Sequence, residues 1–225
     1  MPTYLQNNQS AQITDPKKKV GEGAVPALST AHLGLALDAS ISMRPLAEPA
    51  IQAVNQLLND QKKLNPASRF TLTSFGDSTR PMFENIVLAD APSLGPDRYR
   101  ADGSSTALND AILDIISRIS EDVSRTTPVL IAILTDGAEN SSQATTQDVF
   151  SVITYRRTTY RWNFVFIGPP EAESYALQIG IPKSNFVPFS ADPAGIHFII
   201  KRLSKSMRAY QLGDRRYALK LHNPS

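Results

Sequence analysis

The 225-residue sequence contains no cysteine, and this absence excludes several kinds of chemistry at once. Disulfide bonds, thiolate catalysis and cysteine-ligated zinc or iron–sulfur sites all need a thiol. The chain must therefore be stabilised by its hydrophobic core, and 41% hydrophobic against 20% charged residues is the balance of a soluble globular protein. Because a chain without disulfides suits a reducing compartment, we expect a cytoplasmic location.

Long apolar runs are absent as well. No segment approaches about 20 consecutive apolar residues, the length that a membrane-spanning helix needs, so we expect no membrane association. Residues 1–29 mix Gln, Asn, Ser, Pro and Gly and lack the apolar centre of a signal peptide. This composition predicts a flexible N-terminal tail over 1–29, followed by one domain over 30–210.

Acidic residues are scarce at the other end of the sequence. Residues 201–225 contain seven Lys or Arg, and Asp214 is their only acid. The pattern predicts a basic C-terminal extension over 211–225, for which a solvated helix end is a sufficient explanation. No aromatic-rich strand accompanies the basic residues, so we expect no nucleic-acid binding. We also expect the chain alone to be a monomer.

Short apolar runs alternate with helical stripes through the domain. Continuous runs, typical of strands buried on both faces, lie at 33–37, 129–134 and 164–167, and weaker runs lie at 69–75, 82–88 and 185–189. Stripes with helical spacing lie around 46–58, 108–119, 149–153, 172–179 and 196–207. The alternation predicts a doubly wound α/β fold with a mostly parallel six-stranded sheet, one antiparallel edge strand at 82–88, and helices on both faces.

Polar segments stand next to three of these elements. Asp38, Ser40 and Ser42 come directly after the first strand, Thr106 precedes the helix at 108–119, and Asp136 follows the strand at 129–134. Because ligands of doubly wound sheets bind at the carboxyl ends of the strands, we expect these five side chains to converge there.

The five side chains are hard oxygen donors. Two carboxylates and three hydroxyls suit Mg²⁺, or Mn²⁺ or Ca²⁺, rather than soft metals. Two aspartates only just neutralise a divalent ion, and hydroxyls are neutral ligands. The set therefore predicts an ion that accepts one more anionic oxygen, and an exposed Asp or Glu of a protein partner would supply it. We expect Asp38 and Asp136 to lie on the rim of the site, outside the core.

Asp38-x-Ser40-x-Ser42, the Thr106 that opens a later helix, and Thr135-Asp136-Gly137 together resemble the metal-ion-dependent adhesion site (MIDAS) of von Willebrand factor A-type (vWA) domains. The resemblance covers roughly residues 31–209. It implies that Ser40, Ser42 and Thr106 ligate the metal directly and that the two aspartates often act through water. It also implies a protein-interaction module rather than an enzyme. Residues 135–140 and 162–168 resemble the bacterial, commonly intracellular members of the family.

Two other functions are compatible with the pattern. A phosphate-handling α/β hydrolase of the haloacid-dehalogenase kind also has an aspartate after its first strand, but it needs a second carboxylate at the position of Ser40. Neither a Gly-x-x-x-x-Gly-Lys-Ser/Thr loop nor a Gly-x-Gly-x-x-Gly turn occurs. The other alternative is a vWA scaffold that binds no metal. Ile41 stands where the family usually has Gly, and Thr106 taken alone is an ordinary helix cap.

Overall fold

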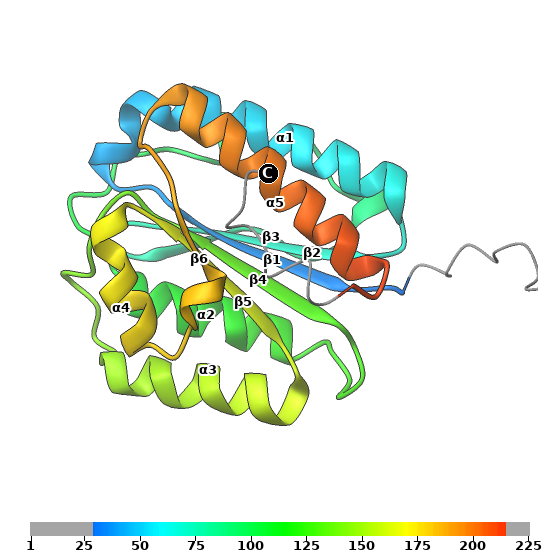
Figure 1. Ribbon diagram of the computed structural model, residues 1–225. Helices are drawn as coiled ribbons and strands as arrows, with labels where there is room; N and C mark the ends of the chain where they lie inside the picture. The colour runs from blue at the N-terminus through cyan, green and yellow to red at the C-terminus, as the bar shows by residue number, and fades with distance from the viewer. Residues whose placement is uncertain (1–28, 215–225) are drawn as a thin grey trace, which may run out of the picture.

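A six-stranded sheet forms the centre of the computed structural model, which describes residues 29–214 (Figure 1). Its order is β3-β2-β1-β4-β5-β6. The strands are β1 His32–Asp38, β2 Arg69–Phe75, β3 Thr79–Val87, β4 Val129–Leu134, β5 Asn163–Gly168 and β6 Phe186–Pro188. Only the edge strand β3 runs antiparallel to its neighbour, β2. The predicted fold class is confirmed, whereas most of the predicted tail and basic extension, 1–28 and 215–225, lie outside the described residues.

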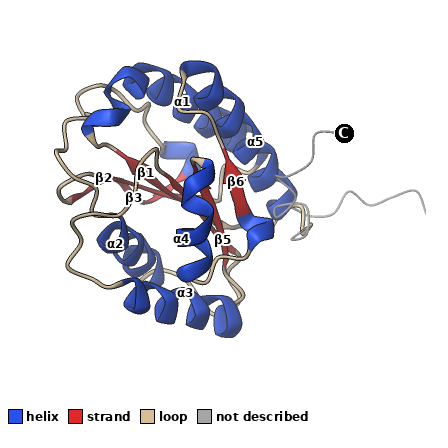
Figure 2. Ribbon diagram, turned by 60° about the vertical axis from the view of Figure 1, so that its left-hand side comes forward, coloured by secondary structure: helices blue, strands red, loops and turns tan. Residues whose placement is uncertain are grey.

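Helices cover both faces of the sheet (Figures 1 and 2). One layer holds α1 Ala47–Leu64 and α5 Pro193–Gln211; the other holds α2 Leu108–Ser120, α3 Thr146–Tyr160 and α4 Glu173–Gln178. Short 3-10 turns complete the described part: η1 Ile41–Leu46, η2 Leu88–Asp90, η3 Pro170–Ala172 and η4 Lys183–Asn185. Helix α5 continues one residue past the predicted domain end at 210. None of the helices in residues 29–214 is long and apolar enough to cross a membrane.

Side chains of the central strand β1 pack into the hydrophobic cores on both faces of the sheet. Leu33, Leu35 and Leu37 belong to the core beneath α1 and α5, whereas Ala36 belongs to the core beneath α2 and α3. Successive side chains of a strand point to opposite faces, so a continuous apolar run fills two cores at once. A Cβ at Gly34 would lie 2.9 Å from Ile119 Cδ1, so α2 packs this closely on β1 because position 34 carries no side chain.

The register of the two central strands positions the candidate site. β1 and β4 are parallel and paired from His32 with Val129 to Leu37 with Leu134. The next residues, Asp38 and Thr135, therefore leave the sheet next to each other. This brings the first and the last of the three polar segments together at the carboxyl edge of the sheet.

Candidate metal centre

Asp38 is the innermost of the five predicted ligands. Its side chain is fully buried. One carboxylate oxygen accepts a hydrogen bond of 2.7 Å from the Ser40 amide, and the other accepts one of 2.5 Å from the Thr135 hydroxyl. The prediction that Asp38 lies on the rim is wrong, because the strand carries its last residue beneath the loop that follows.

Ser40, Ser42 and Asp136 form a continuous chain of polar contacts above Asp38. The two serine hydroxyl oxygens lie 3.0 Å apart, and the Ser42 hydroxyl donates a hydrogen bond of 2.9 Å to Asp136 Oδ1. Ser40 occupies the cap position of η1, but its side chain makes no capping hydrogen bond. Both hydroxyls are therefore directed at each other and at Asp136 rather than at the backbone of the turn.

The loop that carries the serines is held by backbone pairing. Ser40 and Gly103 form a parallel bridge, in which the Ile41 amide donates to the Gly103 carbonyl at 2.7 Å and the Gly103 amide donates to the Ala39 carbonyl at 3.1 Å. The Ile41 side chain is 53% exposed. Among the described residues only Asn85 and Arg161 have a positive φ outside glycine, so the conformation at position 41 does not require Gly.

Thr106 is not used as a helix cap. The cap position of α2 is Ala107, without a side-chain hydrogen bond. The free amides of the first turn are satisfied from the loop after β4 instead: Asn109 donates to the Glu139 carboxylate at 2.7 Å, and Asp110 donates to the Ser142 hydroxyl at 3.1 Å. The capping role that sequence alone left open for Thr106 is therefore filled by other residues.

The segment after β4 runs beside Thr106. A Cβ at Gly137 would lie 3.7 Å from Thr106 Oγ1. The Thr106 amide donates to the Asn140 side-chain oxygen at 2.8 Å, and the Asn140 amide donates to the Thr106 carbonyl at 3.2 Å. All three polar segments thus meet at one place, with Thr106 almost fully buried and Ser42 exposed.

The surroundings of the Asp38 and Asp136 carboxylates disfavour their ionised forms. Neither Asp38 nor Asp136 forms an ion pair with a Lys or Arg of residues 29–214. Burial raises the pKa of both aspartates; hydrogen bonds from Thr135 and Ser40 oppose the rise at Asp38, and one from Ser42 opposes it at Asp136. Buried carboxylates of this kind are paired or coordinate a cation in most proteins.

No group of three or more His, Cys, Asp or Glu side chains within residues 29–214 is placed to hold a metal ion. A cation at this site would therefore depend on the hydroxyls of Ser40, Ser42 and Thr106 as well as on the two aspartates. That donor set of neutral and anionic oxygens fits a hard divalent ion and does not fit a soft one.

Solved structures with the same architecture identify the fold. A von Willebrand factor type A protein from Catenulispora acidiphila matches with a TM-score of 0.63 and 17% identity, over 82% of this chain and 43% of that one. The PilB minor pilin from Streptococcus sanguinis matches with a TM-score of 0.64 and 10% identity, over 84% and 64%. Proximal thread matrix protein 1 from the mussel byssus, described with a zinc-occupied MIDAS motif, matches with a TM-score of 0.58 and 12% identity, over 77% and 46%.

This chain has the vWA fold. It spans less than half the length of the mussel and Catenulispora proteins. No protein-family model matches the sequence, and no curated protein matches it.

Besides the five predicted ligands, further residues of this vWA fold hold the site together. The buried Tyr99 hydroxyl donates a hydrogen bond of 2.5 Å to the Asp38 carbonyl, and Thr135 holds the Asp38 carboxylate. Asp77 accepts hydrogen bonds from the side chains of Ser104 and Ser105, which hold its pKa down to about 2. A lone tyrosine in a loop gives no periodic signal, so only the folded chain reveals the role of Tyr99.

Two further titratable residues lie outside this cluster. The Asp110 carboxylate accepts hydrogen bonds from the amides of Gln143 and Ala144. His32 opens β1 at the end opposite the site, and its Nε2 lies 2.8 Å from Thr71 Oγ1. Burial and the charge of Arg69 lower its pKa to about 4, so this ring is neutral at neutral pH.

Proposed function

We propose that this chain is a metal-dependent protein-interaction module that binds one divalent cation, Mg²⁺ or else Mn²⁺ or Ca²⁺. Ser40, Ser42 and Thr106 would hold the ion with their hydroxyl oxygens, and Asp38 and Asp136 would hold it directly or through water. One observation carries the proposal: hydroxyls, the buried carboxylate of Asp38 and the partly buried one of Asp136 converge from three separated segments, no Lys or Arg of residues 29–214 pairs with them, and no helix cap requires them.

The chemistry of a bound ion follows from its charge. A divalent cation at this site would relieve the repulsion and desolvation that now raise the pKa of Asp38 and Asp136. Once the two carboxylates neutralise it, the remaining protein ligands are neutral, and its exposed side can take an anionic oxygen. We infer that a partner Asp or Glu supplies this oxygen, because a Lys or Arg would be repelled by the ion and an amide would bind more weakly.

The comparisons support this proposal by analogy. The mussel protein that shares the fold is described with a zinc-occupied MIDAS motif. We extend such a site to this chain, together with a non-enzymatic role, a cytoplasmic location and membership of the bacterial intracellular subgroup. The hydrolase alternative is weaker, since Ser40, whose hydroxyl lies 3.0 Å from that of Ser42, stands in the place of the required second carboxylate.

Metal binding can be tested by titrating Mn²⁺ into the metal-free chain in a calorimeter. Thr106→Ala removes a hydroxyl that bonds nothing else in the described part of the chain, so we expect folding to be kept and affinity to fall by about tenfold or more. Thr158→Ala is the matched control, because its hydroxyl is exposed on α3 and bonds only the carbonyls of its own helix. Absence of heat at millimolar Mn²⁺, or equal affinity in all three proteins, would refute the metal site.

Partner binding requires a second experiment. Proteins captured on the immobilised chain in Mg²⁺ should be released by EDTA, and the contact residue of a captured partner can then be mapped. Replacing its carboxylate by the amide should weaken the complex by at least an order of magnitude, about 1.4 kcal/mol. A complex that forms equally well in EDTA would place the interface away from the five residues.

A further inference from the structure

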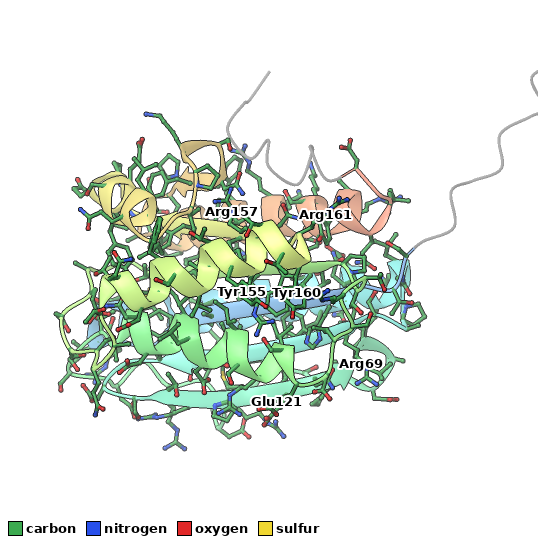
Figure 3. All side chains as sticks on the ribbon, turned by 90° about the horizontal axis from the view of Figure 1, so that it is seen from below. Arg69, Glu121, Tyr155, Arg157, Tyr160 and Arg161 are labelled. Carbon is green, nitrogen blue, oxygen red and sulfur yellow. The ribbon has the colours of Figure 1, made fainter. Side chains whose placement is uncertain are left out.

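At the end of the molecule opposite the candidate metal centre, arginine and tyrosine side chains gather around the C-terminus of α3 (Figure 3). We call this set the arginine–tyrosine cluster: Arg125, Tyr155, Arg156, Tyr160 and Arg161. The guanidinium carbons of Arg125 and Arg156 lie 5.5 and 4.9 Å from the centre of the Tyr160 ring. Tyr155 meets the same ring edge-on, with 5.6 Å between ring centres.

The positive charge of the cluster is not neutralised by carboxylates. In residues 29–214, none of Arg125, Arg156 and Arg161 forms an ion pair with a carboxylate. The Arg156 Nε is buried and has no hydrogen-bond partner. Hydrogen bonds from Tyr155 and Arg125, together with the charges of Arg125 and Arg156, lower the pKa of Tyr160. Arg125 and Arg156 thus bring two guanidinium groups to one tyrosine ring, and in residues 29–214 no carboxylate pairs with either.

A pocket of about 270 Å³ opens between the loop that precedes β4 and the end of α3. It is lined by Arg125, Thr126, Thr127, Pro128, Thr159, Tyr160 and Arg161. Every lining side chain except the proline carries a hydrogen-bond donor, and no acidic side chain lines the pocket. Glu121 and Asp122, the acids that precede this loop, are not among the lining residues.

Arg161 lies at the edge of the pocket in an unusual conformation. It is the C-cap of α3, with φ 57° and ψ 32°, in the left-handed region. Gly is the usual residue at such a position, and a residue with a Cβ there costs on the order of 1 kcal/mol. The attraction between cations and a helix C-terminus explains Arg157 in the last turn of α3, but it does not require an arginine at the strained position.

From these observations we propose that the pocket between Arg125 and Arg161 binds the phosphate group of a phosphomonoester. Guanidinium groups form paired hydrogen bonds to phosphate oxygens, and the threonine and tyrosine hydroxyls supply further donors for a tetrahedral dianion. A free metabolite and a phosphorylated protein side chain present the same group, and the pocket would recognise what they share.

A single-stranded nucleic acid fits the surface less well. Base stacking needs an open aromatic face, whereas Arg125 and Arg156 are stacked over the ring of Tyr160. A nucleic acid would also need a groove that follows several phosphates, and the pocket accommodates one. Its donors therefore match one terminal phosphate.

The test uses the full chain in EDTA, so that the candidate metal centre takes no part. Inorganic phosphate, phosphoserine and a phosphoserine peptide are each titrated, and the arginine Nε–Hε resonances are followed by NMR. We expect saturable shifts for the arginines of the cluster and an affinity about tenfold lower in Arg125→Gln and Arg161→Gly. Arg161→Gly separates binding from folding, because glycine relieves the strained backbone and should not lower the melting temperature.

The control variant is Arg100→Gln, which removes an exposed arginine elsewhere on the surface and should leave phosphate binding unchanged. Tighter binding of the peptide than of phosphoserine would assign the site to a phosphorylated protein, and equal binding would assign it to a small metabolite. The proposal fails if phosphate causes no saturable shift, if Arg125→Gln and Arg161→Gly bind as well as Arg100→Gln, or if an oligothymidine without terminal phosphate binds more tightly than phosphoserine.

Discussion

The two ends of the sheet carry charges of opposite sign that form no ion pair within residues 29–214, and they differ in how those charges are held. At the carboxyl ends of the strands, Asp38 is fully buried and bonded to the backbone and to Thr135. At the amino ends, Arg125 and Arg161 lie around a surface pocket. Asp38 of the candidate metal centre therefore belongs to the folded interior, whereas the arginines of the pocket lie on the surface.

The difference predicts that damage to the two ends has different consequences. A group whose hydrogen bonds hold loops together cannot be removed without loss of stability. A surface arginine without a partner can be removed at little cost. The following experiments test this contrast between a structural and a superficial site.

The largest effect on stability is expected from a core substitution in the sheet, between the two ends. Leu35 is fully buried in the core under α1 and α5. Leu35→Ala should lower the free energy of unfolding by about 2–5 kcal/mol, since it leaves a cavity in a close-packed layer. Denaturant unfolding measures the loss. Both ends should still bind their ligands in the molecules that remain folded, and selective loss at one end would show that Leu35 acts on that site specifically.

Asp38→Ala should be the next most damaging change. It leaves the Ser40 amide without its acceptor, and the buried Thr135 hydroxyl then has the Gly137 carbonyl, at 3.1 Å, as its remaining acceptor among the described residues. We expect a loss of about 1–3 kcal/mol in the unfolding free energy of the metal-free protein. Asp38→Asn keeps an oxygen for the Ser40 amide and should be far milder. Equal losses in the two variants would show that the charge, and not the hydrogen bonds, matters for folding.

The charge of Asp38 should appear in the pH dependence of stability. Its pKa is raised by burial above the ordinary 3.8, so the ionised form is penalised in the folded state. In EDTA the penalty is complete above the folded pKa and disappears as the pH falls towards 3.8. The unfolding free energy of the native chain should therefore rise relative to Asp38→Asn on acidification. At neutral pH, Mg²⁺ at about ten times its dissociation constant should stabilise only the native chain, by about 1.4 kcal/mol.

The smallest effect is expected at the arginine end. Arg161→Gly places glycine at a left-handed helix cap and should raise the unfolding free energy by about 0.5–1 kcal/mol, measured by thermal melting. Asn, which tolerates the same conformation, should behave similarly. A marked destabilisation by Gly would mean that the Arg161 side chain supports the fold, and the contrast between the two ends would disappear.

Sequence patterns predicted much of this molecule because those patterns are local. The apolar runs around Leu35 and Ile131 identified buried strands, and the antiparallel edge strand predicted at 82–88 is formed by Thr79–Val87. The three polar segments were located because each directly precedes or follows such an element. Their convergence then followed from a general property of parallel sheets, without any knowledge of the packing.

The partners of those segments depend on contacts between distant residues. Tyr99 reaches Asp38 across 61 positions, and Glu139 caps α2 from the loop after β4. Neither residue belongs to a periodic pattern. The expectation that Asp38 lies on a rim failed for the same reason, since burial depends on the loops that cover a strand end.

The sequence by itself determined the alternation of strands and helices and the identity of the oxygen donors, because hydrophobic periodicity and side-chain chemistry are properties of short segments. Only the tertiary structure decided that Thr106 is released from helix capping, that Ile41 lies exposed without a positive φ, and that Arg125 and Arg161 face one pocket. These are relations between segments far apart in the chain, and they exist only after the sheet has aligned the strand ends and the helices have packed on it.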